Sequence, residues 1–538
     1  VSRHFMEMGI DITKQDFTVM GIGDMSGDVF GNGMLLSDHI RLLGAFNHRH
    51  IFLDPNPDAK RSFDERKRLF ALPRSSWDDY DQSLISKGGG VFGRDQKSIP
   101  LSSEVKAMLD ASQDTATPDE LIRLMLKARV DLLWNGGIGT YIKATEQSNE
   151  DVGDRANNAV RINGKDCRSK VIGEGGNLGM TQLGRIEYAR AGGRLNTDAI
   201  DNSAGVDCSD HEVNIKIALS DAIAKGTLTL EERNTLLTRM TDDVARLVLV
   251  DNRLQTQALS IAENQGYSQL DSYARLMNRL ESDGFLDRDV EFLPSDKQIG
   301  ELRARKQSLT RPELAILLSY SKLALYRDLK DSSMVEDDYF IADLMRYFPE
   351  PMQEPYRESI LSHRLRKEIV ATIVTNSMVN RAGITFASSV LEETAVHPCD
   401  LARSYVICRD AFRLRDIWSR IESLSGTLNP AVQAEMFVEI SQFLERVVVW
   451  FLRNASFPIN IVQTMQQYAA GIETFANCFE SLMSDTLRKA FERQAEYLTA
   501  KGVPMDLAKQ IAGLEVLSSA CDVVQVANHY HLSIEVVG

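Results

Sequence analysis

Closely spaced glycines near the start of the chain are the residues with the clearest chemical meaning. The segment FTVMGIGDMSGDVFGNG at 17–33 places Gly21, Gly23 and Gly27 directly after an apolar run. An amphipathic stretch over 34–43 follows, so the expected order is strand, glycine turn and helix. Such a turn lets the backbone approach a pyrophosphate and directs the first amides of a helix at its charge. The spacing is GxGxxxG rather than GxGxxG, so a structural glycine turn is the alternative interpretation.

An acidic residue follows roughly where the dinucleotide fingerprint expects one. A second apolar run at 51–53 ends in Asp54, about 27 residues after Gly27. An acid at the end of the second strand would hold a ribose 2′-hydroxyl and favour NAD over NADP. Because a proline- and asparagine-containing segment follows at 55–58, a solvated turn acid is the alternative.

Three further clusters of small and polar residues each follow a short apolar run. They lie at 135–140, 174–177 and 202–206. The carboxyl ends of parallel strands meet at one edge of a sheet, and ligands of such sheets bind there. Together with the opening glycines, the clusters therefore favour nucleotide binding over a set of unrelated turns.

The chain changes character after residue 212. Before it, strand-like segments are expected at 17–20, 50–53, 131–134, 170–173 and 194–196, with a helix at 119–129. Their alternation predicts a mostly parallel sheet with helices on both faces. After it, glycine becomes rare and the apolar residues recur at helical spacing. The expected fold is an α/β Rossmann-like dinucleotide-binding domain over 1–212, followed by a large all-α domain over 213–538.

Three segments of the helical region carry specific expectations. The segment 310–313, TRPE, fits a capping box that opens a buried helix. A helix over 363–381 ends with Asn376, Asn380 and Arg381, which could cap it, pair across a domain interface or touch a ligand. The heptad-like segment 432–452 fits core packing or an oligomer surface.

Composition limits the classes of function. The chain has 538 residues, 43% of them hydrophobic, and a net charge of −15, which argues against nucleic-acid and anionic-membrane surfaces. No apolar run is long enough to cross a bilayer, and no signal-peptide pattern opens the chain. The six cysteines are scattered, as in reduced cytosolic proteins. The nine histidines form no HExxH motif, so the sequence predicts no metal site.

Several long motifs resemble those of glutamate dehydrogenases. Residues 1–212 resemble the carboxy-terminal half of that family's catalytic region, and the whole chain resembles the very large bacterial NAD-specific members. The motifs are GIGDMSGDVFGNGML at 21–35, DLLWNGGIGTYIK at 131–143, EGGNLGMTQLGRIEYARAGGRLNTDAIDNSAGVDCSDHEVNIK at 174–216, TRPELAILLSYSK at 310–322 and HRLRKEIVATIVTNSMVNRAGITF at 363–386.

The resemblance implies roles for individual residues. Gly21 and Gly23, with Gly27, match the turn that holds the cofactor's pyrophosphate, and Asp54 matches the acid on the adenosine ribose. Two further matches concern the nicotinamide half: Asn177 near the nicotinamide ribose, and Asn202 at the carboxamide.

Substrate recognition is also implied by the resemblance. Ser209 follows Asn202 by seven residues, where glutamate dehydrogenases place a serine that binds the substrate γ-carboxylate. Leucine and phenylalanine dehydrogenases have an apolar residue there, so Ser209 favours an acidic substrate. The family's catalytic lysines and aspartate precede its dinucleotide-binding domain, so no catalytic residue is expected in this chain. The similar segment SKGGG at 86–90 follows the nucleotide turn and is interpreted as a subfamily loop.

The resemblance implies NAD-dependent oxidative deamination of L-glutamate to 2-oxoglutarate and ammonium, without a metal, by a cytoplasmic homo-oligomer. The chain begins with Val1 rather than methionine and ends abruptly, so we expect a fragment of a longer polypeptide; a complete processed subunit is the alternative. Three other functions stay open. They are a dehydrogenase of another amino acid, a non-catalytic NAD-binding sensor with a helical interaction domain, and a helical scaffold with a vestigial dinucleotide fold.

Overall fold

A computed structural model describes residues 1–538, and its first part is built on a six-stranded mixed sheet. The strands are β1 (Phe17–Ile22), β2 (Ile40–Phe46), β3 (His50–Leu53), β4 (Gly90–Gly93), β7 (Leu132–Asn135) and β10 (Val171–Glu174). Their spatial order is β10-β7-β1-β2-β3-β4. β10, β7, β1 and β2 are parallel, whereas β3 and β4 are antiparallel additions. The expectation of a mostly parallel sheet therefore holds for four of the six strands.

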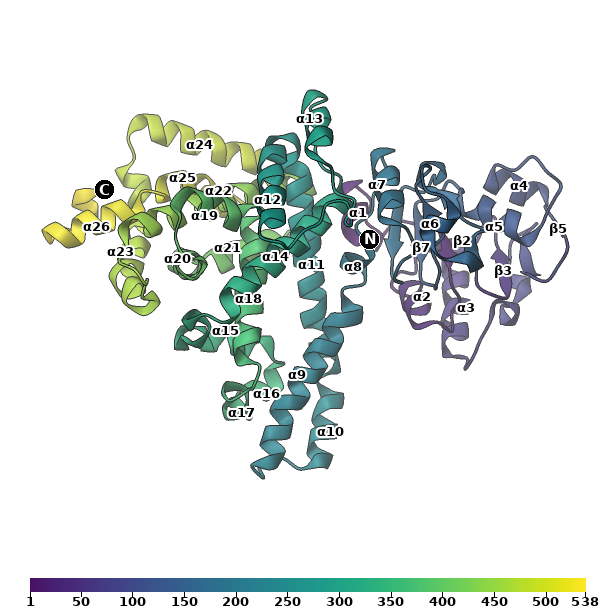
Figure 1. Ribbon diagram of the computed structural model, residues 1–538, viewed down its shortest axis with the longest axis horizontal. Helices are drawn as coiled ribbons and strands as arrows, with labels where there is room; N and C mark the ends of the chain where they lie inside the picture. Colours follow the sequence, from purple (N-terminus) through teal and green to yellow (C-terminus); the bar gives the residue numbers. More distant parts are fainter. The chain divides into compact units, whose positions relative to one another are not determined.

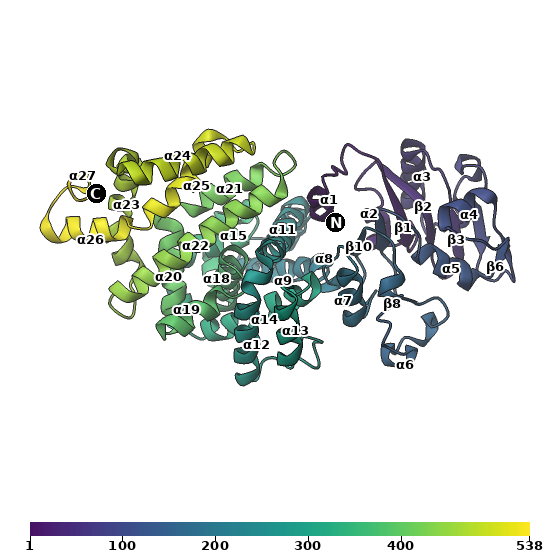
Figure 2. The same cartoon turned by 90° about the horizontal axis from the view of Figure 1, so that it is seen from above.

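Helices cover both faces of this sheet, as expected (Figure 2). Successive side chains of a strand point to opposite faces, so Val19 and Met20 belong to two separate hydrophobic clusters. The Val19 cluster includes residues of α1 (Ser2–Glu7), α2 (Asp28–Gly33) and α3 (Ala59–Ala71). The Met20 cluster includes residues of α4 (Ser103–Leu109), α5 (Pro118–Leu126) and α7 (Gln182–Arg190).

Shorter elements complete this part of the chain. They are β5 (Ile99–Pro100) paired with β6 (Thr115–Ala116), β8 (Ile142–Lys143) paired with β9 (Ile162–Asn163), α6 (Asn149–Val152), α8 (Asp198–Asp201), and the 3-10 helices η1 (Trp77–Asp79), η2 (Gln82–Leu84), η3 (Arg155–Asn157) and η4 (Gly164–Asp166).

The expected helix over 34–43 is wrong. Helix α2 ends at Gly33, and the strand β2 begins at Ile40. Six of the seven β2 residues are buried, since helices cover both faces of the sheet there. A strand buried on both faces is a continuous apolar run, which periodicity alone does not distinguish from a helix. The expected strand at 194–196 is likewise reduced to one bridge between Arg194 and Val171.

The chain forms two compact units (Figure 1). The first comprises Val1–Val206 with the short segments Asp289–Leu293 and Leu309–Ala315, and the second comprises the remaining residues. The division at Val206 lies six residues before the expected boundary at 212, and two later segments of the chain join the first unit.

The second unit is helical. Its helices, two of which begin in the first unit, are α9 (Ala204–Ala224), α10 (Leu230–Arg239), α11 (Thr241–Gln265), α12 (Leu270–Ser282), α13 (Asp296–Ala304), α14 (Arg311–Lys330), α15 (Ile341–Tyr347), α16 (Glu350–Gln353), α17 (Arg357–Leu361), α18 (Arg366–Ala382), α19 (Phe386–Thr394), α20 (Pro398–Ala411), α21 (Leu414–Ser423), α22 (Pro430–Asn454), α23 (Ile461–Leu482), α24 (Asp485–Ala500), α25 (Met505–Leu517), α26 (Ala520–Tyr530) and α27 (Ile534–Val537), with 3-10 helices η5 (Gly266–Gln269), η6 (Ser333–Glu336) and η7 (Asp338–Phe340).

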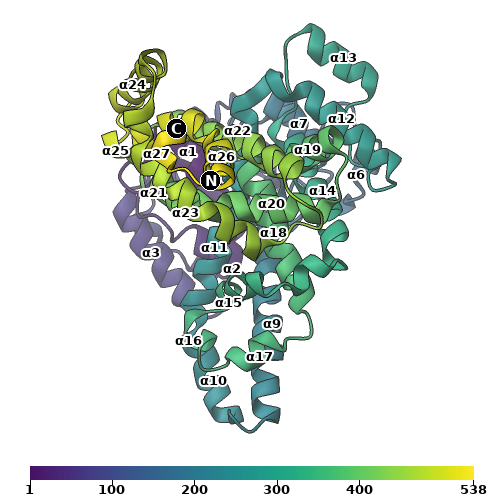
Figure 3. The same cartoon turned by 90° about the vertical axis from the view of Figure 1, so that its left-hand side faces the viewer.

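Two expectations for the helical region are confirmed, the capping box at 310–313 and the core packing of the segment 432–452. Glu313 Oε2 accepts hydrogen bonds from the backbone amide and the hydroxyl of Thr310, both at 2.6 Å, as in a capping box. The heptad-like segment lies in α22 with its apolar residues buried, so it packs in the core. α22 packs against α20, which also contacts α23 (Figure 2), and α24 lies along α25 (Figure 3). No helix is long and apolar enough to span a bilayer.

Candidate functional site

The carboxyl ends of three adjacent parallel strands are joined by backbone hydrogen bonds. Ile22 of β1 lies opposite Asn135 of β7, which lies opposite Glu174 of β10. The amide of Gly136 donates to the carbonyl of Ile22 at 2.9 Å. The amides of Gly175 and Gly176 both donate to the carbonyl of Asn135, also at 2.9 Å. Three of the four clusters found in the sequence therefore form one continuous turn region at the sheet edge where ligands of α/β folds bind.

Phe30 of α2 explains why this region needs glycines. A Cβ on Gly21 would lie 2.5 Å from the Phe30 ring, and a Cβ on Gly23 would lie 2.9 Å from it. A Cβ on Gly136 would lie 2.7 Å from the Phe30 Cα. Gly23 also has a φ of +135°, a conformation that L-residues rarely adopt. These glycines let α2 pack closely on the strand ends, which is one of the roles of glycines in dinucleotide-binding turns.

Gly27 has a different environment from the other two glycines of the motif. It is the N-cap of α2 with a φ of −84°, and the nearest atom to an added Cβ would be the Asp24 carbonyl oxygen at 3.5 Å. Its amide donates to the Asp24 carboxylate at 3.2 Å. The structure therefore requires no glycine for packing at this position, in contrast to Gly21 and Gly23.

Asp24 connects the glycine turn to the end of the neighbouring strand. Its Oδ1 accepts from the amide and hydroxyl of Ser26, at 3.0 and 2.7 Å. Its Oδ2 accepts from the side-chain amide of Asn47 at 2.7 Å. Asn47 directly follows β2, so this pair lies at the carboxyl end of the second parallel strand. Sequence reasoning passed over Asp24, although an Asp two residues before a Ser-Gly pair is typical of an Asx turn.

The structure contradicts the placement expected for Asp54. It follows β3, which runs antiparallel to β2, and its amide donates to the carbonyl of Leu43 within β2 at 2.9 Å. Asp54 is therefore not at the carboxyl end of a parallel strand. Its side chain is fully buried, and Oδ1 accepts from the amide of Ser86 at 3.1 Å and from the Ser86 hydroxyl. The alternative of a solvated turn acid is also wrong, since Asp54 anchors the loop that contains the SKGGG segment.

The two asparagines expected at the nicotinamide lie together. Asn202 Nδ2 donates to Asn177 Oδ1 at 3.1 Å. Asn177 is exposed in the turn after β10, and Asn202 is half-buried at the end of α8. The side-chain amides of two distant sequence clusters thus face the same part of the strand-end region, as expected for one binding site.

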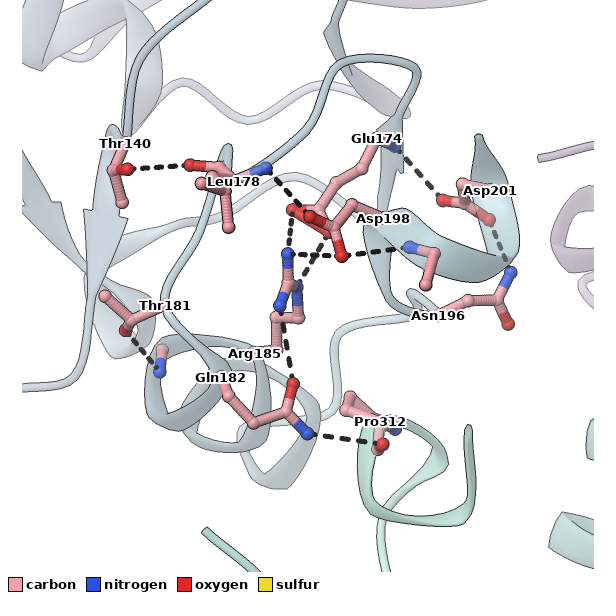
Figure 4. Close-up of polar contacts among 12 residues, drawn as sticks. Thr140, Glu174, Leu178, Thr181, Gln182, Arg185, Asn196, Asp198, Asp201 and Pro312 are labelled. Carbon is pink, nitrogen blue, oxygen red and sulfur yellow. Dashed lines mark hydrogen bonds and ion pairs between the residues drawn. The ribbon is translucent and has the colours of Figure 1, made fainter. Parts of the chain in front are cut away.

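A buried ion pair lies beside the turn between β10 and α7, which contains Leu178 (Figure 4). Arg185 of α7 donates to both carboxylate oxygens of Glu174, at 2.7 and 3.1 Å, and lies 3.2 Å from Asp198. Asp198 in turn accepts from the amide of Leu178 at 2.8 Å, and Asp201 accepts from the amide of Glu174 at 3.1 Å. The turn between β10 and α7 and the short helix α8 are therefore tied to the same arginine.

Burial raises the pKa of Glu174 to about 7, while the Arg185 guanidinium acts in the opposite direction. Both residues are buried, with exposed fractions of 1% for Glu174 and 5% for Arg185. Since an unpaired buried charge is costly, each partner requires the other. Sequence reasoning identified the Glu-Gly-Gly-Asn segment but not Arg185, because nothing local in the sequence predicts this pairing.

Trp134 is a second aromatic residue that sequence reasoning missed. A Cβ on Gly33, Gly173 or Gly175 would lie 2.7 to 2.8 Å from its indole ring. The indole therefore fills the space between α2 and the strands β7 and β10. Three glycines are needed to accommodate this one side chain, one from the opening glycine segment and two from β10 and the turn after it.

Ser209 and the residues of the strand-end site belong to different units. Ser209 is exposed in α9 and belongs to the second unit, whereas Asn177, Asn202 and the glycines belong to the first. Its expected contact with a substrate carboxylate therefore stays a prediction from the resemblance.

Comparison with known proteins gives consistent results along the chain. Residues 1–262 match the family model described as the catalytic domain of bacterial NAD-glutamate dehydrogenase. Residues 306–538 match the model described as the C-terminal region of glutamate dehydrogenase.

Three curated relatives carry the printed name NAD-specific glutamate dehydrogenase. The chain is 46% identical to the protein of Pseudomonas aeruginosa over 528 residues and 45% identical to that of Halomonas elongata over 527, covering 98% of this chain and 33% of each relative. It is 47% identical to the protein of Mycobacterium tuberculosis over 518 residues, covering 95% of this chain and 32% of the relative. The chain thus spans about a third of the length of these relatives. It belongs to the bacterial NAD-specific glutamate dehydrogenase family.

Proposed function

We propose that this chain supplies the NAD-binding part and the helical region of an enzyme that oxidises L-glutamate to 2-oxoglutarate and ammonium, with NAD⁺ accepting the hydride. The single observation that carries the proposal is the turn region at the ends of β1, β7 and β10, which is joined by hydrogen bonds and built on glycines. This arrangement, in a member of the family, matches the place where α/β folds bind dinucleotides. The domain assignment follows: the unit with the sheet binds the cofactor, and the helical unit supports or regulates it.

The nicotinamide half of the cofactor is assigned to the asparagine pair. Asn202 would bind the carboxamide and Asn177 the nicotinamide ribose, so that the ring is fixed with one face toward the substrate. Their mutual hydrogen bond at 3.1 Å supports this assignment, since it brings the two amides into a single site. Fixing the ring in this way contributes to hydride transfer by orientation, while the hydride chemistry itself belongs to the cofactor.

The pyrophosphate is assigned to the turn of Gly21, Gly23 and Gly27. We assign the adenosine ribose to Asp24 rather than to the buried Asp54, because Asp24 reaches the end of β2 through Asn47. A carboxylate there would accept from a ribose 2′-hydroxyl and repel a 2′-phosphate.

Two variants test the ribose assignment. Asp24→Asn should weaken NADH binding. It should also reduce the difference in affinity between NADH and NADPH, because the charge that repels the 2′-phosphate is removed. Asp54→Asn is the matched control, since it removes the same charge from the position that the sequence alone favoured. It should lower stability without changing the NADH-to-NADPH ratio. If only Asp54→Asn changed the ratio of the NADH and NADPH affinities, Asp54 rather than Asp24 would be the residue that contacts the ribose.

Substrate recognition is assigned to Ser209, whose hydroxyl would donate to the γ-carboxylate of glutamate. A hydroxyl there would be left unpaired against an alkyl side chain, which disfavours leucine or phenylalanine as substrate. The catalytic lysine and aspartate are assigned to a part of the enzyme outside these residues. Ser209→Ala in the whole enzyme should raise KM for glutamate selectively, and unchanged kinetics would favour a dehydrogenase of another amino acid.

The first experiment is a fluorescence titration of the purified chain with NADH, with NADPH as the control. Saturable binding that is much weaker for NADPH supports the cofactor assignment. Absence of binding, both in this chain and in the whole protein, would favour a helical scaffold with a vestigial nucleotide fold. Binding without glutamate-dependent turnover in the whole protein would favour a sensor. We further propose a homo-oligomer in the cytoplasm, which the family resemblance supports and light scattering would test.

A further inference from the structure

The helical unit contains a cavity of about 560 Å³ that the proposed cofactor site does not use. Side chains from α9, α11, α15, α18, α20 and α21 line it. Asp207 and His211 of α9 and Asp251 of α11 lie together on its wall, and one ligand-type atom from each lies within 4.8 Å of the other two. Asp207 and His211 are four residues apart, so both project from one face of the helix.

His211 is the buried, unpartnered side chain of this cluster. Its side chain is 2% exposed, and neither ring nitrogen has a hydrogen-bond partner. The ring stacks on Tyr347, with centroids 4.5 Å apart, and this contact uses the ring face rather than a nitrogen. Nε2 lies 3.9 Å from Asp207 Oδ1, which is too far for a hydrogen bond. Buried polar groups are nearly always satisfied, so an imidazole facing two carboxylates without a partner points to a ligand between them.

We propose that Asp207, His211 and Asp251 bind a divalent transition-metal ion, with zinc as the best match. Imidazole nitrogen and carboxylate oxygen are both ligands of this ion, and a site with three protein ligands keeps a fourth position open. Here that position would face the cavity. Two ligands on one tetrahedral zinc lie about 3.3 Å apart. The observed separations of up to 4.8 Å therefore close through side-chain rotation, without movement of the helices.

The charge balance of the cluster agrees with a bound cation. The carboxylates of Asp251 and Asp210 are the negative charges that act on Asp207. Lys322 of α14 is the basic group that interacts with both ligand carboxylates. A dication would neutralise the two carboxylates more completely than one lysine does. The positive charge of Lys322 therefore opposes binding of the metal ion.

Equilibrium dialysis of the purified protein against Zn²⁺ tests the site. We expect one tightly bound equivalent, reduced at least about 100-fold in affinity by His211→Gln or Asp251→Asn, since loss of outer-shell partners alone costs up to that much. Asp210→Asn is the matched control, because it removes the same charge from the same helix but no ligand atom, and it should weaken binding far less than either ligand variant. Lys322→Met should strengthen binding by removing the competing cation.

The exposed Cys208 is a second place on α9 where zinc could bind, so a Cys208→Ser background is required. Loss of the bound equivalent in Cys208→Ser, or its persistence in His211→Gln, would overturn the proposal. So would weaker binding in Lys322→Met. Co²⁺ added to the unmutated protein gives an independent readout, because Co²⁺ in a four-coordinate site absorbs visible light much more strongly than hydrated Co²⁺, and absence of this stronger absorption would also refute the site. This last measurement needs no variant to fold.

Discussion

Replacing Gly23 by alanine should destabilise the glycine turn after β1 far more than the same change at Gly27. The φ of Gly23 is +135°, and holding a non-glycine residue there costs about 1–3 kcal/mol. The added Cβ would lie 2.9 Å from Phe30, and such overpacking costs about 1–3 kcal/mol more. We therefore expect Gly23→Ala to lower the free energy of unfolding of this unit by about 3 kcal/mol.

Gly27→Ala is the matched comparison within the same motif. Gly27 has an ordinary φ of −84°, and no atom lies within 3.4 Å of an added Cβ. Its cost is the difference between glycine and alanine as an N-cap, at most about 1 kcal/mol. If all three glycines of the motif had the same role, Gly23→Ala and Gly27→Ala would lower the free energy of unfolding equally. From the structure we expect the two losses to differ by about 2 kcal/mol.

Hydrogen exchange of peptides from β1 and β2 measures this difference within the unit itself. A loss of about 3 kcal/mol accelerates the exchange of globally protected amides roughly 150-fold, whereas Gly27→Ala accelerates it by at most about 5-fold. Equal exchange in the two variants would refute the packing argument from Phe30. NADH titration of Gly27→Ala adds a separate result, since a stable variant with weakened NADH binding would show that Gly27 serves the pyrophosphate rather than the fold.

Two other outcomes follow from the buried ion pairs. Although burial acts in the opposite direction, Arg409 and Arg415 hold the pKa of Asp343 at about 2 against an ordinary value of 3.8. Because the folded-state pKa is depressed, this stabilisation is present above about pH 4 and is lost as the pH falls toward 2, a change of about 2 kcal/mol. The difference in unfolding free energy between the unmutated protein and Asp343→Asn, measured in urea, should shrink over that interval. Glu174→Gln should destabilise the first unit by roughly 2–3 kcal/mol, less than for a fully broken buried pair because Arg185 keeps Asp198. The exposed Glu146→Gln should have no measurable effect in the same assay.

The strand β2 shows why the order of elements could be predicted only in part from the sequence. Turn and cap signals are local, so the glycine turn, the helix α5 and the capping box at Thr310 were all found from short segments. β2 carries no local signal that separates it from a helix, because burial on both faces removes the alternation of apolar and polar residues. Its identity is decided by its neighbours β1 and β3, which a single sequence does not show.

The expected placement of Asp54 was wrong for a related reason. Its distance from the glycine turn was correct, but the distance rule assumes that the next strand runs parallel to the first. In this chain β2 occupies the parallel position, and β3 returns as a hairpin through the turn at Asn47. Because β2 was not recognised as a strand, the expected direction of β3 was wrong. Asp54, which follows β3, therefore lies in the interior and not at the carboxyl end of a parallel strand.

The glycines of the strand-end region acquire a different meaning in the structure. In the sequence, the three clusters suggested a backbone that approaches a ligand. In the structure, five of these glycines accommodate Phe30 or Trp134, two large side chains between α2 and the strand ends; they are Gly21, Gly23, Gly33, Gly136 and Gly175. Packing of this kind restricts the turns to one geometry before any ligand binds, which lowers the entropic cost of binding. The functional consequence is that Phe30→Leu should loosen the site without touching the cofactor. We expect it to weaken NADH binding while Asn177, Asn202 and Asp24 all remain in place, and unchanged affinity would show that the turns hold their shape independently of this packing.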